Sequence, residues 1–188
     1  MSRRETPFTA VLAVAAGTAL AVRSLIRYTR RMDLRNRVAI ITGGSRGLGL
    51  LLARELAGHG TKLAICARDP AELERAREDL QQNHNAQVFA ETCDITDSTQ
   101  VCTWISKVID HFGQIDILIN NAGVIQTGPL ESMTIEDFED AMRVHFWAPL
   151  YMTLAVLPHM RQRRQGRIVN ISSIGGRISV PHLLPYST

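Results

Sequence analysis

The sequence has few cysteines, and they form no recognisable pattern. Cys66, Cys93 and Cys102 are odd in number and show neither a metal-ligand spacing nor a CxxC motif, so we predict no metal site. Cys66 and Cys93 lie inside predicted strands, where a thiol behaves as a small buried hydrophobic group. Such cysteines are compatible with a reducing compartment.

Positive charge is also scarce once the first 31 residues are set aside. Six arginines against the single Glu5 give this N-terminal segment a net charge of +5, which leaves −2 for the remainder of a chain whose total is +3. The remainder therefore gives no indication of nucleic-acid binding. Its length suffices for one domain with a sizeable core.

Charge is absent between Thr6 and Val22, an apolar run just short of a comfortable membrane span. Three interpretations are open: a secretory signal peptide, a single membrane span with its larger basic flank in the cytoplasm, and a helix on the membrane surface. Export is the interpretation that fits least well with the glycine-rich stretch at 42–49, described next. We therefore predict a membrane-associated helix and basic linker at 1–31, and a domain at 32–188 on the cytoplasmic face of a membrane or in the cytoplasm.

The stretch from residue 38 to residue 49 organises the rest of the chain. Residues 38–41 are consecutive apolar residues, which predict a strand buried on both faces. A glycine-rich turn follows at 42–49 and leads into a helical pattern. Glycines permit a sharp turn and a close approach to a pyrophosphate, whose charge the first amides of the helix bind. The alternative is a tight strand-to-helix connection without a ligand.

Strands and helices alternate along the rest of the chain. We predict strands at 62–67, 87–92, 115–120 and 167–171, and helices at 50–58, 70–82, 96–112 and 134–165, the last with a kink at Pro149. This alternation predicts an α/β fold: a Rossmann-like, doubly wound parallel sheet between two layers of helices. Ligands bind at the carboxyl ends of such strands, where the chain places Thr42, Gly43, Arg68, Asp94, Asn120 to Gly123 and Ser173.

Motifs at these positions give the chain a resemblance to the short-chain dehydrogenase/reductase family. Residues 42–49 match its TGxxxGxG cofactor turn, and residues 120–123 match its NNAG motif. Ser173 matches the catalytic serine, and Tyr186 matches the tyrosine of the YxxxK motif. Together with the charge argument below, the resemblance predicts NAD(P) contacts from Thr42, Gly43, Ser45, Arg46, Gly47, Leu48, Gly49, Arg68, Asp94, Asn120, Asn121, Ala122 and Gly123.

Charge at the end of the second strand bears on the choice of cofactor. A Rossmann fold that binds NAD has an acidic residue there for the ribose 2′-hydroxyl, whereas this chain has Ala67 followed by Arg68. Arginine can bind a 2′-phosphate, and Arg46 in the glycine turn adds a second positive charge. We therefore predict NADP over NAD; the alternative is that both arginines are solvated. Asp94 would contact the adenine, cap a turn, or do both.

The resemblance implies hydride transfer between the nicotinamide and a small carbonyl or alcohol substrate. The protein then has to position the substrate oxygen and move one proton. Ser173 would donate a hydrogen bond to that oxygen, and Tyr186 would transfer the proton. In the family, a lysine four residues after the tyrosine assists it and binds the nicotinamide ribose. The alternatives are a serine that ends a strand and an aromatic side chain that packs at the surface.

Two features depart from the family pattern. His145 stands where the family has an asparagine that supports a water chain to the lysine. A histidine can also bind water and carry protons, so it either replaces the asparagine or is a core residue. The sequence also stops at Thr188, before the expected lysine, which we interpret as a fragment of a longer reading frame.

Two classes of function follow from these expectations. The first is an oxidoreductase whose complete parent supplies the lysine and forms a homodimer or homotetramer, as the resemblance implies. The second is a catalytically inactive module that binds a nucleotide or associates with a membrane. In either case the fifth strand is expected to leave an apolar edge unpaired.

Overall fold

The computed structural model describes residues 12–13, 15–18, 23, 32–178 and 180–187. The chain divides into two units, residues 1–33 and 34–188. Within the first unit the described residues before residue 24 are helical and exposed. Among the described residues, no helix combines the length and hydropathy needed to cross a bilayer. Most of the predicted membrane-associated segment lies outside the described residues, so its role stays a prediction.

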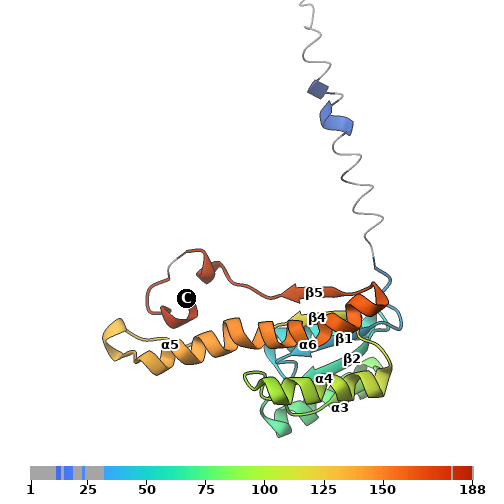
Figure 1. The fold of residues 1–188 in the computed structure, drawn as a ribbon, viewed down its shortest axis with the longest axis horizontal. Helices are drawn as coiled ribbons and strands as arrows, with labels where there is room; N and C mark the ends of the chain where they lie inside the picture. Colours follow the sequence, from blue (N-terminus) through green and yellow to red (C-terminus); the bar gives the residue numbers. More distant parts are fainter. Residues whose placement is uncertain (1–11, 14, 19–22, 24–31, 179, 188) are drawn as a thin grey trace, which may run out of the picture. The chain divides into compact units, whose positions relative to one another are not determined.

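The second unit is built on five parallel strands in the order β3-β2-β1-β4-β5 (Figure 1). Every residue of the central strand Val38–Thr42 is buried, as expected for a strand with helices on both sides of the sheet. The predicted parallel α/β sheet is confirmed. The strands are β1 (Val38–Thr42), β2 (Lys62–Cys66), β3 (Val88–Ala90), β4 (Ile117–Asn120) and β5 (Arg167–Asn170).

The helices form a layer on each face of the sheet. α2 contacts α3, and α4 contacts α6, as right-handed crossovers in the two directions from β1 require. One core cluster joins alternate residues of the strands, such as Val38 and Ile40, to α4 and α6. The helices are α2 (Gly47–Gly58), α3 (Pro70–His84), α4 (Ser98–Phe112), α5 (Ile135–Met142) and α6 (Ala148–Arg163).

Helix boundaries follow local signals in the sequence. Asp69 caps α3 by accepting a hydrogen bond from the backbone nitrogen of Glu72 at 2.9 Å, with Pro70 as the first helical residue. Gly113 ends α4 with a φ of 74°. Both boundaries were predicted. The cap of α4 by Asp97 was not, and it shortens the predicted helix by two residues.

The long helix is irregular at a different place from the one predicted. The structure has a π-helical turn, η2 (Arg143–Trp147), between α5 and α6, and Pro149 lies in the first turn of α6. A proline ring clashes with the carbonyl four residues earlier, here that of His145. We infer that the wider π turn relieves this clash, so the helix changes pitch before the proline. π turns of this kind are frequent at functional sites.

β5 is an edge strand, as predicted (Figure 1). Val169 and the following Ile171 are 41% and 40% exposed. Three 3-10 turns complete the fold: η1 (Leu130–Ser132), η3 (Ile174–Gly176) and η4 (Pro185–Ser187). The last of these contacts α5 and η3, so the end of the chain folds back over the carboxyl ends of the strands.

His159 is expected to make the stability of the domain depend on pH. Its Nε2 accepts a hydrogen bond from the backbone nitrogen of Ile115 at 3.3 Å, which requires an unprotonated nitrogen. Burial and the charge of Arg163 lower the pKa of His159 from 6.5, against the opposing effect of Asp116. Below pH 6.5 the unfolded chain therefore binds a proton that the folded chain does not, and stability falls as the pH falls.

Urea unfolding at about pH 7.5 and about pH 5.5 measures this effect. His159→Gln keeps a hydrogen-bond acceptor but does not titrate. The loss of unfolding free energy on acidification should be smaller in this variant than in the parent chain. An equal loss in both would contradict the assignment.

Candidate functional site

The glycine turn after β1 is held together by contacts too close for any larger residue. A Cβ on Gly49 would lie 2.2 Å from the carbonyl oxygen of Gly43 and 2.6 Å from Nδ2 of Asn121. No real Cβ approaches backbone so closely. The start of α2 can therefore pack against the end of β1 only because residue 49 is glycine.

Two polar side chains tie this turn to the turn after β4. The buried Thr42 hydroxyl accepts hydrogen bonds from the backbone nitrogens of Asn121 and Ala122, both at 3.0 Å. Asn121 Nδ2 donates to the carbonyl oxygen of Thr42 at 2.9 Å and to that of Gly43 at 3.3 Å. The two predicted motifs are thus one hydrogen-bonded unit.

The N-terminus of α2 differs from those of α3 and α4. α3 and α4 each begin with a side-chain cap that binds their first amides, and at the start of α5 the side chain of Asp137 accepts a hydrogen bond from the backbone nitrogen of Thr134. α2 has no side-chain cap, and its first turn carries no acidic residue. Its first residues, Gly47 and Leu48, line a cavity. Uncapped amides at a positive helix end form a site for an anion such as a phosphate.

This cavity has a volume of about 650 Å³ and lies over the carboxyl ends of the strands. It is bounded by the glycine turn, by the ends of β2 and β3, by the turn after β4 and by Tyr186. The predicted site residues in its wall are Gly43, Ser45, Arg46, Gly47, Leu48, Arg68, Asp94, Asn121, Ala122, Gly123 and Tyr186.

Three predicted cofactor residues lie outside the cavity wall because their atoms hold it in place. Thr42 and Gly49 support the glycine turn through the contacts described above. Asn120 is buried and donates from Nδ2 to Oδ1 of Asn170 at 2.8 Å, which joins β4 to β5. The side chains of Thr42 and Asn120 thus have structural roles, and a contact of either residue with a cofactor stays a prediction.

The positive charges in the cavity wall have an acidic neighbour. Arg46 Nη1 donates to Oε1 of Glu72 at 3.1 Å, and Ser45 Oγ donates to Oε2 at 3.4 Å. The Arg46 side chain is 80% exposed, so this ion pair is weak and easily exchanged for another anion. Arg68 and Glu72 line the same cavity. Glu72 was not predicted, since nothing in the sequence indicates that α3 faces the glycine turn at this residue.

Asp94 caps a turn in the cavity wall. Its Oδ1 accepts hydrogen bonds from the backbone nitrogen of Thr96 at 3.0 Å and from Thr96 Oγ1 at 2.8 Å. The structural role considered for Asp94 is thus present. Because Asp94 also lines the cavity, a contact with an adenine stays open as well.

The predicted catalytic side chains meet around Gly175. A Cβ at this buried glycine would lie 3.1 Å from Cε1 of Tyr186 and 3.5 Å from Oγ of Ser173. Ser173 Oγ accepts a hydrogen bond from the nitrogen of Gly175 at 3.1 Å, which leaves its own hydrogen available for donation. Of these side chains, Tyr186 lines the cavity and Ser173 does not.

His145, a residue of the π turn, lies beside Tyr186. The two rings meet edge to face, with centroids 5.3 Å apart. Nε2 of His145 is 2.9 Å from the carbonyl oxygen of Val124, which can only accept, so Nε2 carries the hydrogen. In the neutral ring Nδ1 is then an acceptor. His145 does not line the cavity, but it supports both Tyr186 and the turn after β4.

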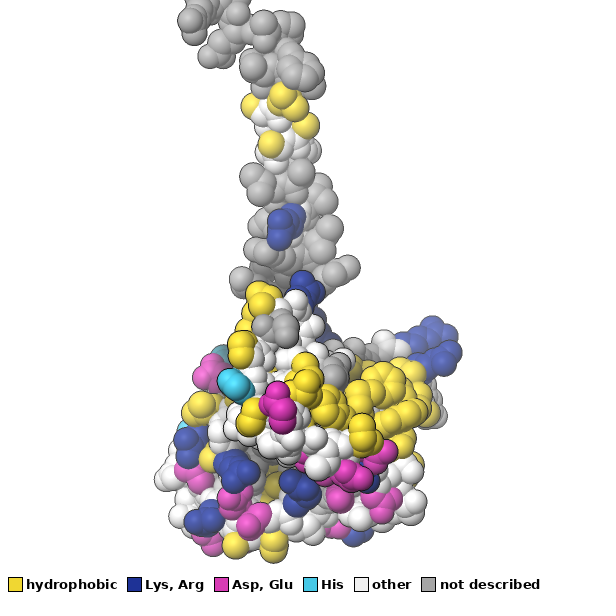
Figure 2. Space-filling model, turned by 90° about the vertical axis from the view of Figure 1, so that its left-hand side faces the viewer, with side chains coloured by type: hydrophobic (Ala, Val, Ile, Leu, Met, Phe, Trp, Pro, Cys, Tyr) yellow, Lys and Arg dark blue, Asp and Glu magenta, His cyan; other side chains and the backbone are white. Residues whose placement is uncertain are grey.

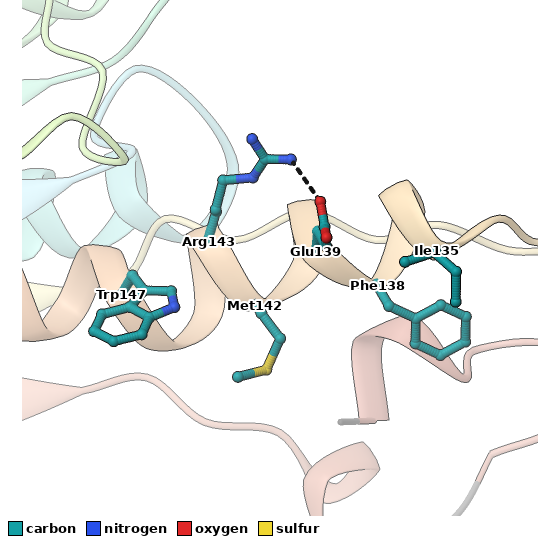
Figure 3. A pocket seen from close by; sticks show the side chains of 6 residues that line it. All are labelled: Ile135, Phe138, Glu139, Met142, Arg143 and Trp147. Atoms are coloured by element: carbon teal, nitrogen blue, oxygen red, sulfur yellow. Dashed lines mark ion pairs between the residues drawn. The ribbon is translucent and has the colours of Figure 1, made fainter.

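A second hollow of about 550 Å³ follows α5 and the π turn and is lined by Ile135, Phe138, Glu139, Met142, Arg143 and Trp147. Figure 3 shows Phe138 and Met142 on one side of the helix, whereas Arg143 extends to the other side toward Glu139. Figure 2, which views the α5 end of the domain, shows hydrophobic side chains gathered there. None of the predicted site residues lines this hollow.

A glycine turn between a central strand and an uncapped helix, opening on a cavity at the strand ends, defines a dinucleotide-binding α/β protein. Comparison of the chain with known proteins agrees with this conclusion. The family model for short chain dehydrogenases matches residues 37–188, so the chain belongs to the short-chain dehydrogenase/reductase family.

Named relatives support this assignment. Dehydrogenase/reductase SDR family member 7B of Mus musculus is 35% identical over 175 residues, which cover 89% of this chain and 54% of that protein. Among solved structures, NAD⁺-bound xylitol dehydrogenase has a TM-score of 0.79 at 27% identity and covers 83% of this chain and 60% of its own. A metagenomic short-chain oxidoreductase in complex with NADP has a TM-score of 0.77 at 30% identity, covering 83% of this chain and 71% of its own.

Two facts follow from these matches. The chain spans about half the length of the curated relatives it matches. The two similar structures hold NAD⁺ and NADP, so the likeness supports dinucleotide binding without choosing between the cofactors.

Proposed function

We propose that the protein to which this chain belongs interconverts a small carbonyl compound and an alcohol with NADP(H). The observation that carries the proposal is that one cavity is lined both by the glycine turn with the uncapped start of α2 and by Tyr186. This supports a phosphate site and a proton donor in the same space.

The residues present fit a dinucleotide. The amides of Gly47 and Leu48 would bind the pyrophosphate, Asp94 would contact an adenine edge, and Asn121 to Gly123 would shape the ribose side. NADPH, when bound, supplies the hydride. The chain would position the dinucleotide and provide the charged groups around it.

The proposed catalytic residues would transfer one proton and stabilise the charge on the substrate oxygen. The Ser173 hydroxyl would donate a hydrogen bond to that oxygen, since it accepts one from the nitrogen of Gly175 and its own hydrogen stays available. The Tyr186 hydroxyl would transfer the proton. His145, fixed by Val124 and in contact with Tyr186, would accept a hydrogen bond at Nδ1 and connect Tyr186 to water.

Arg46 and Arg68 are proposed to select NADP over NAD by binding the 2′-phosphate. Replacing either one by alanine should weaken NADPH binding about tenfold, since a charged hydrogen bond contributes about 1.5 kcal/mol. NADH binding should change less than about twofold because NADH lacks that phosphate. Glu72→Gln should strengthen NADPH binding by releasing Arg46. Fluorescence titration of the chain with each nucleotide measures all of these effects.

Arg77→Ala is the matched control. Arg77 lies on α3, pairs with Glu74 and does not line the cavity, so its loss removes the same charge away from the site. If Arg46→Ala and Arg68→Ala affect NADPH and NADH equally, the proposed selection of NADP is wrong. NADPH binding without NADPH oxidation across a panel of carbonyls, with no in-frame lysine encoded past codon 188, would favour the inactive nucleotide-binding module.

The proposal also covers the substrates and binding partners of the protein. Small carbonyls or alcohols are the substrates, nucleic acid is not a partner, and residues 1–31 associate with a membrane. A homodimer or homotetramer is supported by exposed hydrophobic side chains along the long helix, among them Phe146, Trp147 and Leu154.

A further inference from the structure

Two buried thiols lie together in the wall of the cofactor cavity. Cys66 is the last residue of β2 and is fully buried, and Cys93 follows β3 and is 3% exposed. Both belong to one core cluster, and both line the cavity. β2 and β3 are neighbouring parallel strands, and the backbone nitrogen of Cys93 donates to the carbonyl oxygen of Ala67 at 3.2 Å. Both residues therefore form part of the cavity wall.

The two thiols differ in reactivity. The Cys66 thiol donates a hydrogen bond to the sulfur of Cys93. Donating this bond, together with burial, raises the pKa of the Cys66 thiol well above its ordinary value. Accepting it lowers the pKa of the Cys93 thiol, despite the opposing effects of burial and of the nearby carboxylates, with Asp94 the largest of these. Because the thiolate is the nucleophile, we expect Cys93 to react first.

Cys66 is also bonded to the glycine turn. Its carbonyl oxygen accepts hydrogen bonds from the backbone nitrogens of Gly43 at 2.9 Å and Gly44 at 3.2 Å. Asp94, another residue of the cavity wall, directly follows Cys93. A covalent link between the two sulfurs therefore pulls on the phosphate site and on the turn at Asp94 together.

We propose that Cys66 and Cys93 form a redox-active dithiol, which closes to a disulfide and thereby lowers the affinity of the cavity for its dinucleotide. The identity of the dinucleotide rests on the proposed function, whereas the reaction of the thiols does not. Cys102, on the exposed surface of α4, is not part of this site.

The oxidant is a hydroperoxide, such as hydrogen peroxide. The Cys93 thiolate attacks one peroxide oxygen, the O–O bond breaks, and the hydroxide that leaves takes up the proton released by Cys93. Cys66 then attacks the sulfur of the Cys93 sulfenic acid, the S–O bond breaks, and water leaves with the proton of Cys66. Two thiols thus lose two electrons and two protons, and one peroxide becomes two waters. A thiol reductant reverses the link.

The first test uses the chain with Cys102→Ser, which removes the competing exposed thiol. After hydrogen peroxide and blocking of free thiols, peptide mass spectrometry should find residues 66 and 93 in one cross-linked pair, which dithiothreitol separates. With Cys66→Ser added, Cys93 should give a trappable sulfenic acid and no link. Absence of the link in the Cys102→Ser chain, or faster reaction of Cys66 than of Cys93, would overturn the proposal.

The second test concerns the dinucleotide. NADP⁺ at 100 times its Kd should slow formation of the disulfide about 100-fold, because only the free form is then oxidised. The disulfide form should bind NADP⁺ at least about tenfold more weakly than the reduced form. Unchanged binding after the link forms would overturn the regulatory effect. Failure of the reduced chain to bind NADP⁺ before any oxidation would instead contradict the proposed function.

Discussion

Replacing Gly49 by alanine is expected to destabilise the domain by about 3 kcal/mol and to abolish dinucleotide binding. The added Cβ would lie 2.2 Å from the carbonyl oxygen of Gly43 and 2.9 Å from its carbonyl carbon. These are backbone atoms, so no rotamer change can relieve the clash. The turn must open, and opening it also breaks the hydrogen bonds that Asn121 makes with Thr42 and Gly43.

Gly58→Ala is the matched control on the same helix. No atom lies within 4 Å of the Cβ that it adds, and the residue does not have a positive φ. It is therefore expected to leave binding unchanged and to stabilise α2 by about 0.5–1 kcal/mol. Urea unfolding and fluorescence titration with NADPH measure both properties. If Gly49→Ala bound NADPH as tightly as the parent chain, the glycine turn would not be the phosphate site.

The parallel sheet and the meeting of its strand ends were predictable because they depend on local patterns. Apolar runs such as 38–41 mark buried strands, and residues such as Asp69 and Gly113 mark helix ends within a few positions of themselves. Parallel topology then brings the carboxyl ends together by geometry alone. That is why Arg68 and Asp94, far apart in the sequence, were correctly expected at one cavity with the glycine turn.

The features that the sequence did not predict depend mostly on contacts between distant segments. The π turn at residues 143–147 spans too few residues for its period to differ visibly from that of an α-helix. The roles of Thr42 and Asn120 depend on their partners across the sheet, which only the register of β1, β4 and β5 reveals. Likewise, the pairing of Arg46 with Glu72 depends on how α3 packs beside the glycine turn.

Replacing Asp116 by alanine is expected to lower the unfolding free energy by about 3–4 kcal/mol. Its carboxylate is completely buried, and Oδ2 accepts a hydrogen bond from the backbone nitrogen of Val38 at 2.9 Å. Oδ1 accepts from Arg163 at 3.0 Å and from Arg37 at 3.3 Å. One side chain thus joins the starts of β1 and β4 to the end of α6, and its removal leaves a buried backbone donor without this acceptor.

Two further variants separate charge from hydrogen bonding at this position. Asp116→Asn keeps an oxygen for Val38 but loses the charge opposite the arginines, so its loss of stability should fall between those of the parent chain and Asp116→Ala. Asp79→Ala removes an ion pair with Arg54 at the surface and should cost at most about 1 kcal/mol.

Asp116 lies at the amino end of β4, whereas the cavity is lined by residues after its carboxyl end. The folded Asp116→Ala chain should therefore bind NADPH with an unchanged Kd, in contrast to Gly49→Ala. Equal loss of stability in Asp116→Ala and Asp79→Ala would show that the buried network contributes no more than a surface pair. A change in Kd would show that the two ends of the sheet are energetically coupled, which the arrangement of these contacts gives no reason to expect.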